Sequence, residues 1–185
     1  MPGARAKVVE WWFRYPGGTD QYQLWHPTDH VFSDREGRVP GTHIGSSHLV
    51  HDYLAGSDGP LYELRINFRD PAEFFDLQAW AGFDGGGVCA RIGALEMPVN
   101  LGLMTHVERN TPWGCDMRSR FFLGHVESRG PGHPFSEAEA AAISAEMVTP
   151  DLARRLHQHA SEEMGFLADL LPVMYRQVTQ DFSAA

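Results

Sequence analysis

Residues 151–176 read DLARRLHQHASEEMGFLADLLPVMYR, the longest stretch of this 185-residue chain with a helical hydrophobic period. Its apolar side chains recur every three or four residues, which places them on one face of a helix. The stripe consists of Leu152, Leu156, Phe166, Leu170 and Met174, flanked by Ala160, Leu167 and Leu171. The pattern predicts a long C-terminal helix over residues 151 to about 176 that packs this face against the rest of the fold.

Strand-length segments come before this helix and are separated by turns rich in Gly and Pro. Within residues 61–68 apolar and polar side chains alternate, which is typical of a half-buried strand. The connections are too short for parallel crossovers, so the strands should pair antiparallel. The predicted strands cover roughly residues 42–54, 61–68, 88–97, 101–109 and 117–127, with a turn at Asp84-Gly85-Gly86-Gly87.

Two further segments favour helix. Residues 136–147 open with Ser136, followed three residues later by Glu139, which is a capping-box pattern before an Ala-rich run. A short helical segment is expected near the N-terminus. Together these elements predict a single α+β domain over residues 1–185, in which a curved antiparallel sheet packs against the C-terminal helix.

Charge and cysteine content exclude several classes of protein. The chain has 24 acidic and 15 Lys or Arg residues, a formal net charge of −9, which argues against binding to nucleic acid or to anionic membranes. Cys89 and Cys115 are too few for a disulfide scaffold, so we expect a reducing, cytoplasmic setting. No window reads as a secretory signal or as a membrane-spanning segment.

The gap in the apolar stripe between Leu156 and Phe166 contains His159 and Glu163. These two residues are four apart, so their side chains lie one turn apart on the core-facing side of the helix, whereas His157 should face elsewhere. A helix supplies two ligands to one metal ion with this spacing. The alternative is an intrahelical ion pair. A carboxylate that faces the core nevertheless needs a positive partner, and a metal ion provides one.

A catalytic metal needs at least a third ligand from elsewhere in the chain. Composition and periodicity do not choose among the remaining candidates. These are His26, His30, His43, His48, His51, Asp52 and His106. His125 and His133 flank a Gly-Pro turn and are expected in solvent.

Four segments carry a resemblance that spans nearly the whole chain. They are Glu10-Trp11-Trp12-Phe13, Trp25-His26-Pro27-Thr28-Asp29-His30, Met117-Arg118-Ser119-Arg120-Phe121-Phe122-Leu123-Gly124, and His159-x-x-x-Glu163 followed by Leu170-Leu171-Pro172-x-x-Tyr175. In this combination and order the chain resembles the 2,4-diacetylphloroglucinol hydrolase and phloretin hydrolase family. The resemblance implies a helix-grip fold, as in Bet v 1-like and START-like proteins. It also implies a cavity between sheet and helix that holds one divalent metal ion.

The resemblance also implies the metal ligands. They are His30, His106, His159 and Glu163, with one further carboxylate that we place at Asp52. The family pattern has Glu at this last position, so the shorter Asp leaves a water-bridged role open. Glu63 is the alternative, although strand alternation puts it opposite the apolar face. The donor set suits Zn²⁺, with Fe²⁺, Mn²⁺ and Co²⁺ as alternatives.

The expected partner is a small aromatic or polyketide-like substrate. Tyr22 matches a family tyrosine that contacts a phenolic hydroxyl, whereas Phe121 replaces a second such tyrosine and Ser33 replaces an asparagine. The resemblance therefore implies that the substrate pocket is retained and that the substrate differs. A homodimer remains open.

The implied reaction is hydrolysis of the carbon–carbon bond between a polyphenolic ring and an acyl group, a retro-Friedel–Crafts deacylation. Asp52 or Glu163 would carry the proton to the ring carbon, and Tyr22 would orient a ring hydroxyl. Two alternatives keep the fold. One is a cyclase or other tailoring enzyme of aromatic polyketides, and the other is a non-catalytic protein that binds a hydrophobic ligand.

Overall fold

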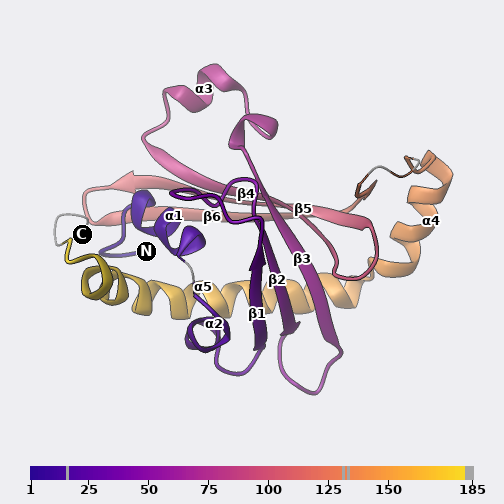
Figure 1. The fold of residues 1–185 in the computed structure, drawn as a ribbon, viewed down its shortest axis with the longest axis horizontal. Coiled ribbons are helices and arrows are strands. Elements are labelled where there is room, and N and C mark those ends of the chain that lie inside the picture. Colours follow the sequence, from indigo (N-terminus) through magenta and orange to yellow (C-terminus); the bar gives the residue numbers. More distant parts are fainter. Residues whose placement is uncertain (16, 131, 133, 182–185) are drawn as a thin grey trace.

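The structure is a computed structural model that describes residues 1–15, 17–130, 132 and 134–181. It has an α+β architecture, with a curved six-stranded antiparallel sheet and a long C-terminal helix (Figure 1). Each strand pairs with the next one along the chain, in the order β1-β2-β3-β4-β5-β6. The strands are β1 His30–Glu36, β2 Ser47–Tyr53, β3 Leu61–Arg69, β4 Gly85–Ala94, β5 Val99–Thr111 and β6 Gly114–Ser128. The helices are α1 Ala6–Arg14, α2 Thr19–Trp25, the 3-10 turn Pro71–Glu73, α3 Leu77–Ala81, α4 Glu137–Met147 and α5 Pro150–Thr179.

The five strands expected from the sequence correspond to β2 through β6, and the two expected C-terminal helices are α4 and α5. The Ser136 side chain accepts the Glu139 backbone N–H as the capping box predicts. Strand β1 was not expected. Its buried side chains include the polar His30 and Ser33, while Val31 and Phe32 are exposed, so the usual apolar alternation is missing.

The glycine run at residues 85–87 lies within β4, not in the turn that the sequence suggested. The physical reason is that α1 crosses the sheet closely at this point. A Cβ atom at Gly86 would lie 2.6 Å from Oε1 of Glu10 and 3.2 Å from Cβ of Ala6. Gly86 therefore lets α1 approach the strand.

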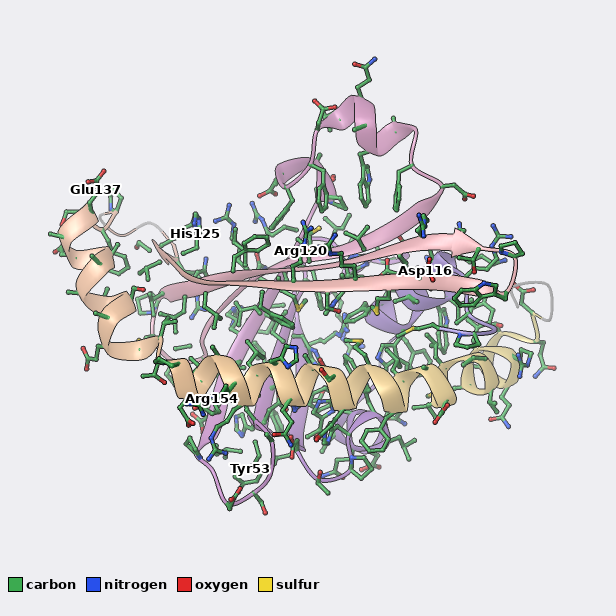
Figure 2. The ribbon with its side chains drawn as sticks, turned by 180° about the vertical axis from the view of Figure 1, so that it is seen from behind. Tyr53, Asp116, Arg120, His125, Glu137 and Arg154 are labelled. Carbon is green, nitrogen blue, oxygen red and sulfur yellow. The ribbon has the colours of Figure 1, made fainter. Side chains whose placement is uncertain are left out.

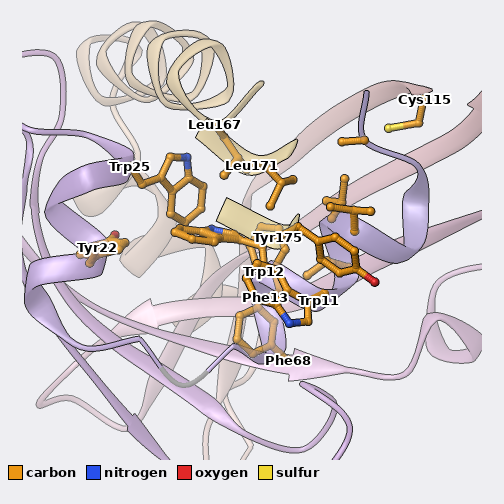
Figure 3. Close-up of a cluster of buried hydrophobic side chains, with 14 of the residues drawn as sticks. Trp11, Trp12, Phe13, Tyr22, Trp25, Phe68, Cys115, Leu167, Leu171 and Tyr175 are labelled. Carbon is orange, nitrogen blue, oxygen red and sulfur yellow. The ribbon is translucent and has the colours of Figure 1, made fainter. Parts of the chain in front are cut away.

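Helices α1 and α2 bring an aromatic core between the sheet and α5 (Figure 3). Trp12 and Phe13 each meet Trp25 edge to face, with ring centroids 5.7 Å apart, and Trp11 meets Tyr175 of α5 at 5.1 Å. This apolar cluster holds α5 to the N-terminal helices. In the described part of the chain, none of the helices has the length and apolarity needed to cross a membrane.

Candidate metal centre

A cavity of about 60 Å³ lies between the sheet and α5, and we call it the interior cavity. Its walls come from five parts of the fold: α1, α2, strands β2 to β6, the β2–β3 connection and α5. The polar side chains on its wall are Tyr22, His48, Asp52, His106, His159 and Glu163. The remaining wall is apolar, which means that these groups face one another in a largely dry space.

Three of the predicted ligands come together beside this cavity, whose wall includes His159 and Glu163 but not His30. One donor atom each of His30, His159 and Glu163 lies within 4.8 Å of the others, and all three residues are buried. The Oε2 atom of Glu163 is 3.7 Å from Nε2 of His30 and 3.8 Å from Nε2 of His159. His159 and Glu163 share one face of α5, as their spacing predicted. We call these three residues the donor group.

The surroundings of His30 fix its ring and leave its Nε2 atom without a hydrogen-bond partner among the described residues. The His30 Nδ1–H donates to the backbone carbonyl of Tyr22 at 2.8 Å, which leaves the lone pair on Nε2. That Nε2 atom is buried and has no hydrogen-bond partner among the described residues. Burial lowers the pKa of His30 to about 4, so its ring is a neutral imidazole, the form that binds metals.

His159 is oriented by Asp29, a residue that the sequence analysis did not single out. The His159 Nδ1–H donates to Oδ2 of Asp29 at 3.0 Å, which turns Nε2 toward Glu163. The backbone N–H groups of Ala55 and Gly56 also donate to this carboxylate, at 2.9 and 3.0 Å. Burial alone would raise the pKa of Asp29, but these bonds and the nearby His26 lower it, so the carboxylate is charged. A carboxylate behind a histidine is the usual support of a metal ligand.

Glu163 is fixed through its backbone as well. The indole N–H of Trp25 donates to the Glu163 carbonyl oxygen at 2.8 Å, which ties α2 to the middle of α5. Burial raises the pKa of the Glu163 carboxyl to about 7, although His159 and His26 oppose that rise. A bound cation would favour the charged form.

Asp52 lies on the cavity wall beside the donor group but outside it. The Tyr22 hydroxyl donates to its Oδ2 atom at 2.9 Å, and its Oδ1 atom has no partner among the described residues. Burial raises the pKa of Asp52 well above its usual range, and Glu163 and Asp29 add to that rise against the Tyr22 hydrogen bond. Burial thus favours the protonated, uncharged form of the Asp52 carboxyl.

His106 also faces the cavity without joining the donor group. Its Nδ1 atom is 2.7 Å from the hydroxyl of Ser119, and its ring stacks on Phe13. Phe121 lies on the same wall, edge-on to His106 with centroids 6.0 Å apart.

The other candidates lie away from the donor group. Ser33 is hydrogen-bonded at 2.7 Å to His48 and lies in a smaller neighbouring pocket. Glu63 is exposed on β3 and does not line the cavity. His157 is exposed as expected, and so is His125, whereas His133 lies outside the described residues.

A second buried group, His26 with Asp29 and His159, also has donor atoms within 4.8 Å of one another. The Nδ1 atom of His26 accepts the Asp29 backbone N–H at 3.2 Å, so in the neutral ring the proton is on Nε2. That Nε2 atom faces two carboxylates, Glu162 at 3.4 Å and Asp29 at 3.7 Å. We therefore interpret His26 as a support for Asp29 and not as a ligand.

Comparison with known proteins identifies the family of this chain. The family model described as DAPG hydrolase PhiG domain matches residues 1–176. The chain belongs to the DAPG hydrolase family. This confirms the resemblance found in the sequence.

Two relatives of this DAPG hydrolase family member are both named 2,4-diacetylphloroglucinol hydrolase. One is from a Pseudomonas species and the other from Pseudomonas protegens, and each is 29% identical over 207 aligned positions. The alignments cover 96% of this chain but only 65% and 62% of the two relatives. The chain therefore spans a little less than two thirds of their length.

Proposed function

We propose that this protein is a metal-dependent hydrolase that cleaves the carbon–carbon bond between a polyphenolic ring and an acyl group. Family membership and the names of the two relatives support the class of substrate. The observation that supports a metal site is the buried Nε2 atom of His30, which has no hydrogen-bond partner among the described residues. It faces the same Glu163 oxygen as Nε2 of His159. Two imidazoles and a carboxylate suit Zn²⁺ first, with Fe²⁺, Mn²⁺ and Co²⁺ as alternatives.

In this proposal His30, His159 and Glu163 hold the metal. The cavity-facing His106 completes the site directly or through water, and Asp52 contacts it through water. A bound Zn²⁺ would supply a Lewis acid and lower the pKa of a water molecule from about 16 to about 7. The overall reaction adds one water across the ring–acyl bond. The acyl group leaves as a carboxylic acid, and the ring carbon gains a proton.

The difficult step is the departure of a ring carbon, which needs a proton at that carbon. Asp52 is suited to deliver it, because burial raises the pKa of its carboxyl and so favours the protonated form, and Tyr22 holds the group in place. Glu163 is the second candidate for this role, with a pKa near 7 before any metal binds. Tyr22 would also orient a ring hydroxyl.

The substrate ring would lie against the apolar wall that contains Phe121. Phenylalanine offers contact area but no hydrogen bond there. Ser33 would affect the cavity only through His48, because its hydroxyl is hydrogen-bonded to the His48 ring on the cavity wall. We also infer that the fold is of the helix-grip type, because the sheet is antiparallel throughout and α5 runs along it (Figure 1).

Elemental analysis of protein purified without chelator, followed by incubation with acylphloroglucinols, tests this proposal. We expect about one transition metal ion per chain, and a free carboxylic acid together with the deacylated ring. Two results would contradict it. A product that keeps every carbon of the substrate would indicate a cyclase, and ligand binding without metal or turnover would indicate a carrier.

A further inference from the structure

An open groove of about 430 Å³ lies outside the interior cavity, between β6 and the first half of α5. We call it the outer groove. Figure 2 shows β6 and α5 running alongside each other, with side chains between them. The groove is lined by Ser119, Phe121, Leu123, Ala153, Leu156 and His157, and by Ala160, Ser161 and Met164.

Two side chains line both spaces: Phe121 of β6 and Leu156 of α5. They form the boundary between the groove and the cavity. Ser119 gives a second connection, because it lines the groove while its hydroxyl bonds to His106 on the cavity wall. The groove therefore adjoins the interior cavity at these side chains.

The sizes of the two spaces show that an acylated ring does not fit inside the cavity alone. The interior cavity has about 60 Å³, less than half of the ~150 Å³ that holds a benzene molecule in a protein core. The outer groove is several times larger. A pocket of about 30 Å³ adjoins the cavity on its other side, at Tyr22 and His48, and is smaller still.

The chemistry of the groove indicates what it would bind. None of its described lining residues is Lys, Arg, Asp or Glu. Its surface is mixed, with apolar side chains beside polar groups that include the hydroxyls of Ser119 and Ser161 and the imidazole of His157. Such a surface fits an uncharged phenolic ring that carries carbonyl or hydroxyl substituents, and it offers no cation for a phosphate or carboxylate.

We propose that the substrate ring spans the boundary at Phe121 and Leu156 and places its far substituent in the outer groove. The scissile acyl group then lies inside, near Tyr22 and Asp52, and Leu156 with Ser161 sets the size of the far substituent. This inference rests on the proposed function, because that function identifies the group inside the cavity as the scissile acyl group. It assigns α5 a part in substrate choice besides its part in the metal site.

Calorimetric titration with monoacetyl- and diacetylphloroglucinol tests the groove without requiring turnover. Ser161 is an exposed groove residue, so Ser161→Trp fills the groove without overpacking the core. We expect this variant to bind the diacetyl compound at least about tenfold more weakly and the monoacetyl compound about as before. The matched control is Val173→Trp, at an exposed position of the same helix that lines neither space. It should leave both affinities unchanged.

Leu156→Ala should have the opposite effect, with relatively tighter binding of rings that carry bulkier far substituents. Circular dichroism spectra and melting temperatures of each variant show whether it is folded. Unchanged affinities in a folded Ser161→Trp protein, equal losses for both compounds, or no binding by the wild type would overturn the groove proposal. Release of acid with an unchanged size preference refutes the groove alone. Size-selective binding without any acid release refutes the proposed function alone.

Discussion

The Nδ1 atom of His159 lies 3.0 Å from Oδ2 of Asp29, a residue 130 positions earlier in the chain. This contact joins the segment before β1 to the middle of α5. The same carboxylate holds the backbone at Ala55 and Gly56, where Ala55 adopts a φ of 64°, an uncommon conformation for alanine. Asp29 is thus the point at which three distant segments meet, behind the imidazole that we propose as a metal ligand.

Asp29→Asn tests this support. The substitution removes the negative charge that favours the Nδ1–H form of His159, so zinc affinity should fall by about 10-fold to 100-fold. Competition with a chromophoric chelator measures this affinity in the absence of substrate. The control is Asp34→Asn, at an exposed position on β1. Equal zinc affinity in the Asp29 variant and the wild type would mean that the contact is only structural.

Asp52→Asn separates a proton carrier from a ligand. Asp52 lies outside the donor group, so the variant should keep its metal. Its amide cannot donate a proton as an acid does, and the hydrolysis rate should fall by about 10² to 10⁴. Metal content and kcat are measured on the same sample. Loss of metal would make Asp52 a ligand, and an unchanged kcat would remove it from the mechanism.

The buried carboxyl of Glu108 should make the free energy of unfolding depend on pH, and this effect is separate from the metal site. Its side chain is fully buried on β5, and neither carboxyl oxygen has a partner among the described residues. Burial, followed by the nearby Glu10, raises the pKa of Glu108 well above 4.5. The folded protein therefore keeps this proton, whereas the unfolded chain loses it above about pH 4.5. The stabilisation that comes from this raised pKa of Glu108 is complete below about pH 4.5, and it is lost as the pH rises toward the pKa of Glu108 in the folded protein.

Glu108→Gln should therefore weaken the pH dependence. Between about pH 5 and about pH 8 the free energy of unfolding should fall less steeply than in the wild type, by up to about 1.4 kcal/mol per pH unit. Urea unfolding of both proteins in chelator measures the two slopes under equal metal-free conditions. Parallel slopes would show that Glu108 is ionised in the folded protein.

The sequence predicts those parts of the fold and site whose signal is local. The helical period of residues 151–176 places His159 and Glu163 on the buried face of α5, as the structure has them. Strand β1 carries no such signal, since it buries the polar His30 and exposes Phe32.

The role of Asp29 could not have been predicted from local pattern. It depends on contacts with residues 26 and 130 positions away. Likewise, the helical spacing of His159 and Glu163 indicates a pair of ligands, but it does not indicate which residue elsewhere in the chain lies beside them. His30 was one of several histidines, and only the antiparallel register that brings it opposite Asp52 at the edge of the sheet puts it near α5.

The proposed function depends on a cation held by the donor group. Two histidines of α5 allow a direct test, because only one of them belongs to that group. His159 is buried in that group, whereas His157, two residues earlier, is exposed. Metal content per chain, measured by mass spectrometry on His159→Ala and His157→Ala purified side by side, tests the claim. We expect a folded but metal-free His159 variant and a His157 variant with the metal content of the wild type. Equal metal content in a folded His159 variant would contradict it.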